Sequence, residues 1–184
     1  LQPSLGRALA VVFEGALAIY QLDELASGGL PTVVSEGQTD VSLIRDLVAV
    51  DDWLILAGDG AVGLFDGDLQ RQGPPWSLPA GGEVFRISVT GDRVLLAASG
   101  GIWIGEWETM ANYEAVFSAD TARSVVSLGD QRIAVGTLNA GIQLLDDAGA
   151  LVATVDNPGA TVAAAGIGPE LAVADGRGGL RLRQ

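Results

Sequence analysis

Residues Gly129–Gly149, GDQRIAVGTLNAGIQLLDDAG, contain two short apolar runs joined by a turn-forming segment. The first run follows Arg132 and the second begins at Ile142. Asn-Ala-Gly lies between the runs and Asp-Asp-Ala-Gly follows the second, and residues of these types are typical of tight turns. The stretch therefore predicts a β-hairpin whose two strands are mostly buried.

The same hairpin pattern recurs along the whole chain. When the first apolar residue of each second strand is aligned, the equivalent positions are Leu17, Val62, Ile102, Ile142 and Leu180, at intervals of 45, 40, 40 and 38 residues. A period of about 40 with only short β-type segments is typical of a four-stranded propeller blade. We therefore predict an all-β chain, with residues 1–184 forming one β-propeller domain of about five units.

The three middle units each offer four strand-like segments. They are Leu43–Val50, Trp53–Ala57, Ala61–Phe65 and a weak Pro75–Leu78; Val84–Val89, Arg93–Ala98, Gly101–Trp107 and Tyr113–Ser118; and Arg123–Leu128, Arg132–Gly136, Gly141–Leu145 and Leu151–Val155.

The first and last units are incomplete. The first offers Leu9–Phe13, Leu17–Leu22 and Pro31–Ser35 with no innermost strand, and the last offers Thr161–Ala165, Glu170–Ala174 and Gly179–Arg183 with no outer strand. Open sheet edges invite further pairing. Two alternatives stay open: a compact five-unit ring with imperfect closure, or part of a larger ring completed by self-association or a companion segment.

Composition excludes several classes of function. The chain has 23 acidic residues against 10 arginines and no lysine, a net charge of −13, which disfavours nucleic-acid binding. No apolar run approaches the ~18 residues that a membrane-spanning helix requires. Because Cys and His are absent, Cys/His zinc sites and Ser-His-Asp or Cys-His catalysis are excluded within this chain. We expect no cofactor and no metal, and the sequence favours no cellular compartment.

At the hairpins the chain resembles β-propeller repeat families. Leu17–Val34, LAIYQLDELASGGLPTVV, is similar to LVIVD-type repeats, and Ile133–Thr154, IAVGTLNAGIQLLDDAGALVAT, is similar to NHL-type repeats. The marks of WD40 repeats, Gly-His and a strand-closing Trp-Asp, are absent. The resemblance implies a propeller fold and a role in binding, and it implies no catalytic residue.

Two motifs are better explained by turns than by ligand sites. Gly58–Gly63, GDGAVG, formally matches G-x-G-x-x-G, but a dinucleotide site requires a helix after the glycines, and the following residues do not favour one. The acidic pairs Asp51/Asp52, Asp66/Asp68 and Asp146/Asp147 lack the spacing of an EF-hand calcium loop. We interpret both as turn features.

Four residues are candidates for binding. Arg45, Arg86 and Arg123 are spaced by 41 and 37 residues near the start of the first strand of their units, which would line a central channel. Planar guanidinium groups suit carboxylates and phosphates. The alternative is that each arginine pairs with local acids such as Asp46, Glu83 and Asp120. Trp76, in a Pro-Pro-Trp segment, is the tryptophan for which we expect most exposure; Trp53, Trp103 and Trp107 are expected to pack between units.

Two functions from different classes remain. The first is a non-enzymatic binding or scaffold module that uses one propeller face for a protein or a small anionic ligand. The alternative is a carboxylate-dependent hydrolase, glycosidase-like or sialidase-like. Glycosidases need two acids about 5–10 Å apart, and sialidase-like enzymes use a tyrosine nucleophile, for which only Tyr20 and Tyr113 are available. The S-x-D-x-G-x-T-W type of motif is absent, so the binding module is favoured.

Overall fold

The computed structural model describes residues 8–13, 16–21, 28–79, 81–117, 121–128, 132–155, 161–167, 170–175 and 180–183. Within these ranges the chain forms eighteen strands and no helix, and the strands assemble into five antiparallel sheets in chain order. We number the sheets 1 to 5 along the chain. This architecture confirms the predicted all-β fold with repeated blade-like units.

Sheets 2, 3 and 4 each have four strands in sequence order. Their strands are β4 (Asp46–Val50), β5 (Trp53–Ala57), β6 (Ala61–Phe65) and β7 (Trp76–Ser77); β8 (Val84–Thr90), β9 (Arg93–Ala98), β10 (Gly101–Glu106) and β11 (Ala111–Phe117); and β12 (Ala122–Leu128), β13 (Arg132–Thr137), β14 (Ile142–Asp146) and β15 (Leu151–Val155). The sequence predicted these strands to within a few residues at each end.

The two terminal sheets have three strands each among the described residues. Sheet 1 contains β1 (Ala8–Phe13), β2 (Ala16–Gln21) and β3 (Thr32–Gln38), and sheet 5 contains β16 (Thr161–Ile167), β17 (Glu170–Asp175) and β18 (Leu180–Arg183). Leu17 on β2 is equivalent to Ile142 on β14, the third strand of sheet 4. Sheet 1 therefore has the second to fourth strands of a blade, and sheet 5 has the first to third, as the sequence predicted.

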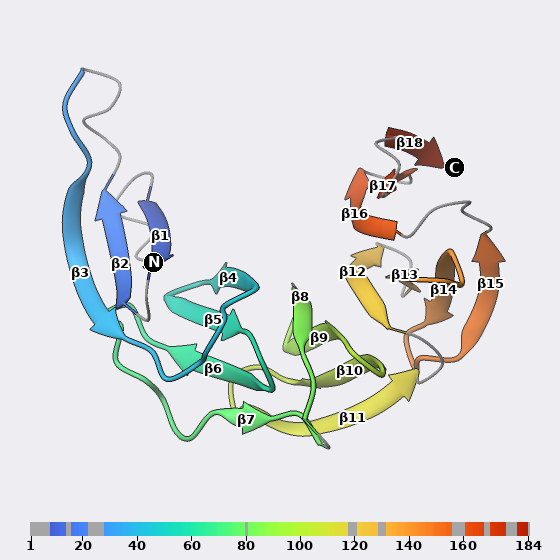
Figure 1. The fold of residues 1–184 in the computed structure, drawn as a ribbon, viewed down its shortest axis with the longest axis horizontal. Helices are drawn as coiled ribbons and strands as arrows, with labels where there is room; N and C mark the ends of the chain where they lie inside the picture. The colour runs from blue at the N-terminus through green and yellow to red at the C-terminus, as the bar shows by residue number, and fades with distance from the viewer. Residues whose placement is uncertain are drawn as a thin grey trace.

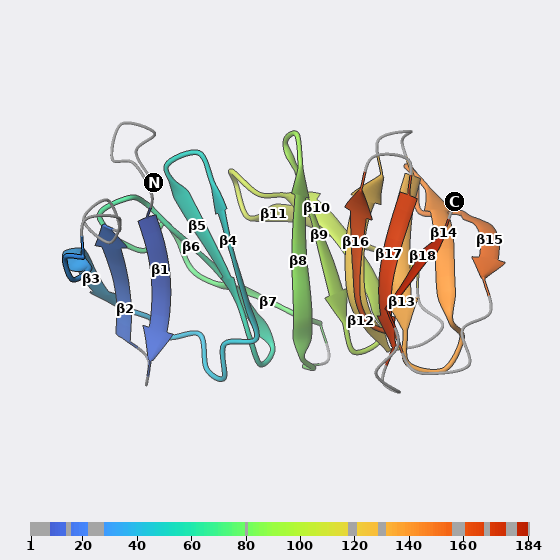
Figure 2. The ribbon, with the colours of Figure 1, turned by 90° about the horizontal axis from the view of Figure 1, so that it is seen from above.

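The five sheets follow one another around an open arc. Figure 1 shows β4, β8, β12 and β16 on the concave side and β3, β7, β11 and β15 on the convex side, with sheets 1 and 5 at opposite ends. Seen from above, the strands stand side by side and are linked by turns at both ends (Figure 2). Consecutive inner strands are in contact from β4 to β8, from β8 to β12 and from β12 to β16.

Each middle strand packs against two neighbouring sheets because its side chains alternate between opposite faces. On β9, Val94, Leu96 and Ala98 belong to the core with sheet 2, whereas Leu95 and Ala97 belong to the core with sheet 4. All five are fully buried. This double burial explains why the middle strands are continuous apolar runs instead of alternating ones.

The two turn predictions that fall on described residues are confirmed. Gly58–Gly60 joins β5 to β6 as a hairpin in which Gly58 N–H donates to the Ala61 carbonyl at 3.1 Å, and Gly60 has a φ of 69°, which favours glycine. Asp66 Oδ1 accepts hydrogen bonds from the backbone N–H groups of Asp68 and Gln70 at 3.1 and 2.8 Å. Asp146 accepts equivalent bonds from Ala148 and Ala150 at 3.0 and 2.8 Å. These carboxylates stabilise turns.

The part of the chain that the structure describes contains no helix that is long and apolar enough to cross a membrane.

Candidate functional site

Sheets 2, 3 and 4 each place one side chain at the same position of the repeat, at or just before the start of the inner strand. In sheet 3 the pairing with β9 passes from Val84 to Arg86, so Phe85 is an extra, bulged residue. In sheet 4 the pairing with β13 passes from Ala122 to Ser124, so Arg123 is the bulged residue there. In sheet 2 the corresponding position is Arg45, which precedes β4 and whose backbone N–H donates to the Ala57 carbonyl at 2.8 Å. β-bulges redirect side chains at just such positions.

These three side chains form a continuous row across sheets 2, 3 and 4, which we call the Arg45–Phe85–Arg123 row. The Arg123 guanidinium carbon lies 4.0 Å from the centroid of the Phe85 ring, and that of Arg45 lies 5.9 Å from it. Both distances fall within the range of cation–π contacts. Phe85 and Arg123 are half-buried and Arg45 is exposed, so the row is accessible from solvent.

Ion pairs that cross between sheets 2 and 3 surround the row. Arg45 Nη2 lies 2.5 Å from Glu83 Oε1 and 3.6 Å from Asp59 Oδ1. Arg86 Nη1 lies 3.3 Å from Asp46 Oδ1, and Asp46 Oδ2 accepts the Ile87 backbone N–H at 2.7 Å. Two of the acids named as local partners therefore do pair with the arginines: Glu83 pairs with Arg45, and Asp46 pairs with Arg86. The inner strands are adjacent in space, so the partners come from neighbouring sheets.

The structure brings the three predicted arginines onto adjacent inner strands, but Arg86 is not equivalent to the other two. It follows the bulged residue by one position and corresponds to Asp46 and Ser124. Asp120, the third acid named as a local partner, lies outside the described residues. Among the described residues Arg123 forms no ion pair. Its guanidinium group contacts the Phe85 ring instead.

Trp76 lies apart from the arginines, on the outer strand β7. It is half-buried and stacks on Tyr113, with ring centroids 4.1 Å apart, and meets Trp103 edge-on at 5.7 Å. Trp53 and Trp103 are half-buried as well, so the expected greater exposure of Trp76 stays a prediction. The Pro-Pro-Trp context does not reveal the stacking of Trp76 on Tyr113 of sheet 3. Trp107 is buried and contacts Trp53, as predicted for tryptophans between units.

Tyr113 does not have the properties of a nucleophile. Burial raises the pKa of its phenol above the ordinary value of 10.0. Its hydroxyl donates to the Met110 sulfur at 3.4 Å. A tyrosine nucleophile needs a lowered pKa or an adjacent base. The described geometry of Tyr113 therefore gives no support to the sialidase-like alternative.

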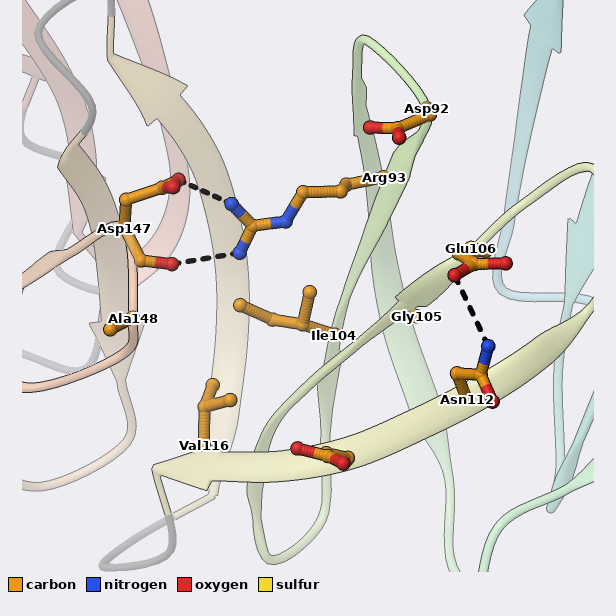
Figure 3. A pocket seen from close by; sticks show the side chains of 10 residues that line it. Asp92, Arg93, Ile104, Gly105, Glu106, Asn112, Val116, Asp147 and Ala148 are labelled. Atoms are coloured by element: carbon orange, nitrogen blue, oxygen red, sulfur yellow. Dashed lines mark hydrogen bonds and ion pairs between the residues drawn. The ribbon is translucent and has the colours of Figure 1, made fainter.

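A separate pocket of about 400 Å³ lies between sheets 3 and 4 (Figure 3). Arg93 crosses it, forming an ion pair with the Asp147 carboxylate and donating to the Asp147 carbonyl at 2.8 Å. Asn112 donates to Glu106 at 3.1 Å on the other side. Ile104 and Val116 supply apolar walls. The Arg93–Asp147 pair links the two sheets, which gives it a structural role.

Among the residues that the structure describes, no cluster of three or more carboxylates could hold a metal ion.

Sequence reasoning missed Phe85, the central residue of the row. Its spacing from Arg45 and Arg123, 40 and 38 residues, matches the hairpin period better than the spacing of Arg86 does. That regularity was the available signal. A pattern of arginines alone does not reveal Phe85, because this repeat position holds arginine in two units and phenylalanine in the unit between them.

Comparison with known proteins places the fold but not the family. No family model and no curated protein matches the chain. The WD40 β-propeller domain of Doa1 matches with a TM-score of 0.72 and 11% identity, over 94% of this chain and 62% of that one. Raptor of Chaetomium thermophilum matches with a TM-score of 0.76 and 17% identity, over 95% of this chain and 17% of that one.

The computationally designed Ika4 protein matches with a TM-score of 0.66 and 16% identity, over 80% of this chain and 98% of that one. The chain thus spans less than two thirds of the Doa1 domain and of Raptor, and nearly all of Ika4 corresponds to part of it. At these identities the matches show the propeller-like fold alone.

Proposed function

We propose that the protein is a non-enzymatic binding scaffold whose concave side binds an acidic segment of a partner protein at the Arg45–Phe85–Arg123 row. The observation that carries the proposal is the row itself: an accessible phenylalanine flanked by two guanidinium groups on three adjacent inner strands. Arginine and aromatic side chains are enriched among the residues that dominate binding energy at protein interfaces. The row also has the chemistry that recognises a carboxylate.

The charges around the row suit a carboxylate-bearing partner despite the net charge of −13. Arg45 and Arg86 are already oriented by Glu83 and Asp46, so they present fixed donors. Arg123 is held by its contact with Phe85. At physiological ionic strength charges separated by more than about 8 Å are largely screened. Acids beyond this distance therefore have little effect. At the row itself Arg45 and Arg86 are already paired with carboxylates, whereas Arg123 forms no ion pair with a described residue and has its charge available for a partner.

A protein partner is favoured over a small anion by the shape of the site. The row extends across three sheets on the concave side of the arc, and Arg86 adds a third guanidinium group beside it. An extended acidic segment can contact all of these groups at once, whereas a small anion contacts one or two. We also propose that residues 1–184 form a single domain and that its repeats are of the LVIVD and NHL types.

The test uses a display library of acidic peptides, with binding measured by titration calorimetry for the selected peptides. The triple variant Arg45→Gln, Arg86→Gln and Arg123→Gln is expected to bind at least about tenfold more weakly, because each charge-assisted hydrogen bond contributes roughly 1.5–3 kcal/mol. Binding by the unchanged protein is expected to weaken with added salt.

The matched control is Arg71→Gln, Arg93→Gln and Arg132→Gln, which changes the net charge equally but lies away from the row. Equal loss in both triple variants would show that net charge matters and the row does not. Selection of peptides without acidic residues would overturn the proposed partner. Circular dichroism of each variant establishes that the sheets are retained.

A further inference from the structure

The end of the arc at sheet 1 carries a face that no described sheet covers. The side chains of Leu17 and Ile19 on β2 are buried against sheet 2. The alternate residues of β2 and their partners on β3 belong to the opposite face, which we call the end face: Ala16, Ala18, Tyr20, Val33, Glu36 and Gln38. Val33 is 39% exposed, and Tyr20 is half-buried.

In the other sheets the equivalent face is an internal contact. Tyr20 is three residues after Leu17, and the same step from Val62 and Ile142 leads to Phe65 and Leu145. Both are 0% exposed, because the preceding sheet covers them. The end face therefore corresponds to one side of a contact between two sheets. A sheet placed against it would extend the series of contacts that holds sheets 1 to 4 together.

The end face is also hollowed. A depression of about 290 Å³ is lined by Ala16, Leu17, Ala18, Tyr20, Glu36, Gly37 and Gln38. The small side chains of Ala16 and Ala18 leave this space beside Tyr20. An opposing sheet with branched apolar side chains is the kind of surface that fills such a depression with the density of a protein core.

We propose that the end face of one copy of this chain docks against sheet 5 of a second copy, head to tail. Sheet 5 ends the arc on the other side (Figure 1). In sequence, β18 carries Leu180 and Leu182 at the repeat positions of Leu17 and Ile19, the pair with which sheet 1 contacts sheet 2. The second copy thus offers the same kind of strand that covers this face elsewhere in the molecule. Such a heterologous contact either closes into a ring or continues into longer assemblies.

Native mass spectrometry of the 184-residue chain at increasing concentration tests the association. Masses of two or more chains are expected, and Val33→Asp is expected to shift the distribution to single chains, because it replaces an apolar side chain of the contact by a charged one. Leu151→Asp is the matched control: it is also an exposed apolar residue on an outer strand, 52% exposed, but on sheet 4. A single-chain mass at every concentration, or association lost in L151D and retained in V33D, would overturn the proposal.

Cross-linking tests which faces meet, since the chain has no cysteine of its own. Mixing Val33→Cys protein with Leu182→Cys protein under oxidising conditions is expected to produce the mixed disulfide-linked dimer in excess over either symmetric dimer. An excess of the symmetric V33C dimer would instead show that two end faces meet, which contradicts the head-to-tail arrangement.

Discussion

The contact between sheets 2 and 3 and the contact between sheets 3 and 4 use opposite faces of one sheet, yet they are built differently. The first combines aliphatic residues with the rings of Trp53, Trp76, Trp103, Trp107 and Tyr113. The second has a buried core of aliphatic residues alone, with Val116 and Phe117 partly buried against it and the Arg93–Asp147 pair beside it. One repeat therefore accommodates an aromatic contact and an aliphatic one, because each needs only apolar residues at alternate positions.

The adjacent residues Leu96 and Leu95 provide the most direct test of this difference. Both are 0% exposed, and they face the aromatic and the aliphatic contact respectively. We expect Leu96→Ala to lower the free energy of unfolding by about 4 kcal/mol and Leu95→Ala by about 3 kcal/mol, since rigid rings collapse less into the cavity. Urea denaturation measures both. Equal costs would show that the aromatic rings do not make the first contact more rigid.

The pH dependence of stability reports on the aromatic contact through Tyr113. Its folded-state pKa is raised by burial above 10.0, so the folded protein holds the proton more tightly than the unfolded chain. Stability is therefore unaffected by this group below pH 10 and falls as the pH rises towards the raised pKa, by up to about 1.4 kcal/mol per pH unit. Denaturation at pH 9 and pH 11 measures the decrease. In Tyr113→Phe this part of the decrease is expected to disappear, and its persistence would assign it to other groups.

The two tryptophans of β10 and its following turn separate packing from hydrogen bonding. Trp107 Nε1 donates to the Gly91 carbonyl at 3.1 Å, whereas the buried Nε1 of Trp103 has no partner among the described residues. Replacing either tryptophan by phenylalanine removes a similar ring volume. We expect Trp107→Phe to cost about 1 kcal/mol more than Trp103→Phe in the free energy of unfolding. A larger cost at Trp103 would imply that its indole N–H is satisfied in solution.

The smallest effect is expected at the polar edge of the contact between sheets 3 and 4. The side chains of Arg93 and Asp147 are 28% and 55% exposed. Replacing Arg93 by Met is expected to cost about 0.5 kcal/mol, as is typical of exposed ion pairs. The difference between R93M and the unchanged protein should shrink in 1 M salt, where the Debye length is about 3 Å. A cost that salt does not change would indicate that the stem of Arg93 contributes by packing.

Local patterns were sufficient to predict most of the strands. The continuous apolar runs of β5, β9 and β13 signal strands buried on both faces, and the turn residues between them fix where each strand ends. Trp76 shows what such patterns do not reveal. Its environment depends on Tyr113 of the next sheet, and no local pattern encodes a contact between residues that are 37 positions apart.

The candidate site was predictable only in part for a similar reason. The spacing of Arg45, Arg86 and Arg123 correctly indicated adjacent inner strands. The bulges at Phe85 and Arg123 then decide which side chains share a row, and a one-residue bulge has no clear mark in the sequence. The acidic partners of Arg45 and Arg86 come from the neighbouring sheet because ion pairs select the nearest carboxylate in space.

The sequence by itself determined the repeat of about 40 residues, the all-β class, the three complete and two incomplete units and the hairpin turns, because these follow from hydrophobic periodicity and turn chemistry. Only the tertiary structure decided the open arc, the Arg45–Phe85–Arg123 row and the exposed end face. These depend on how neighbouring sheets are placed against one another, which is settled by packing and register across many residues at once.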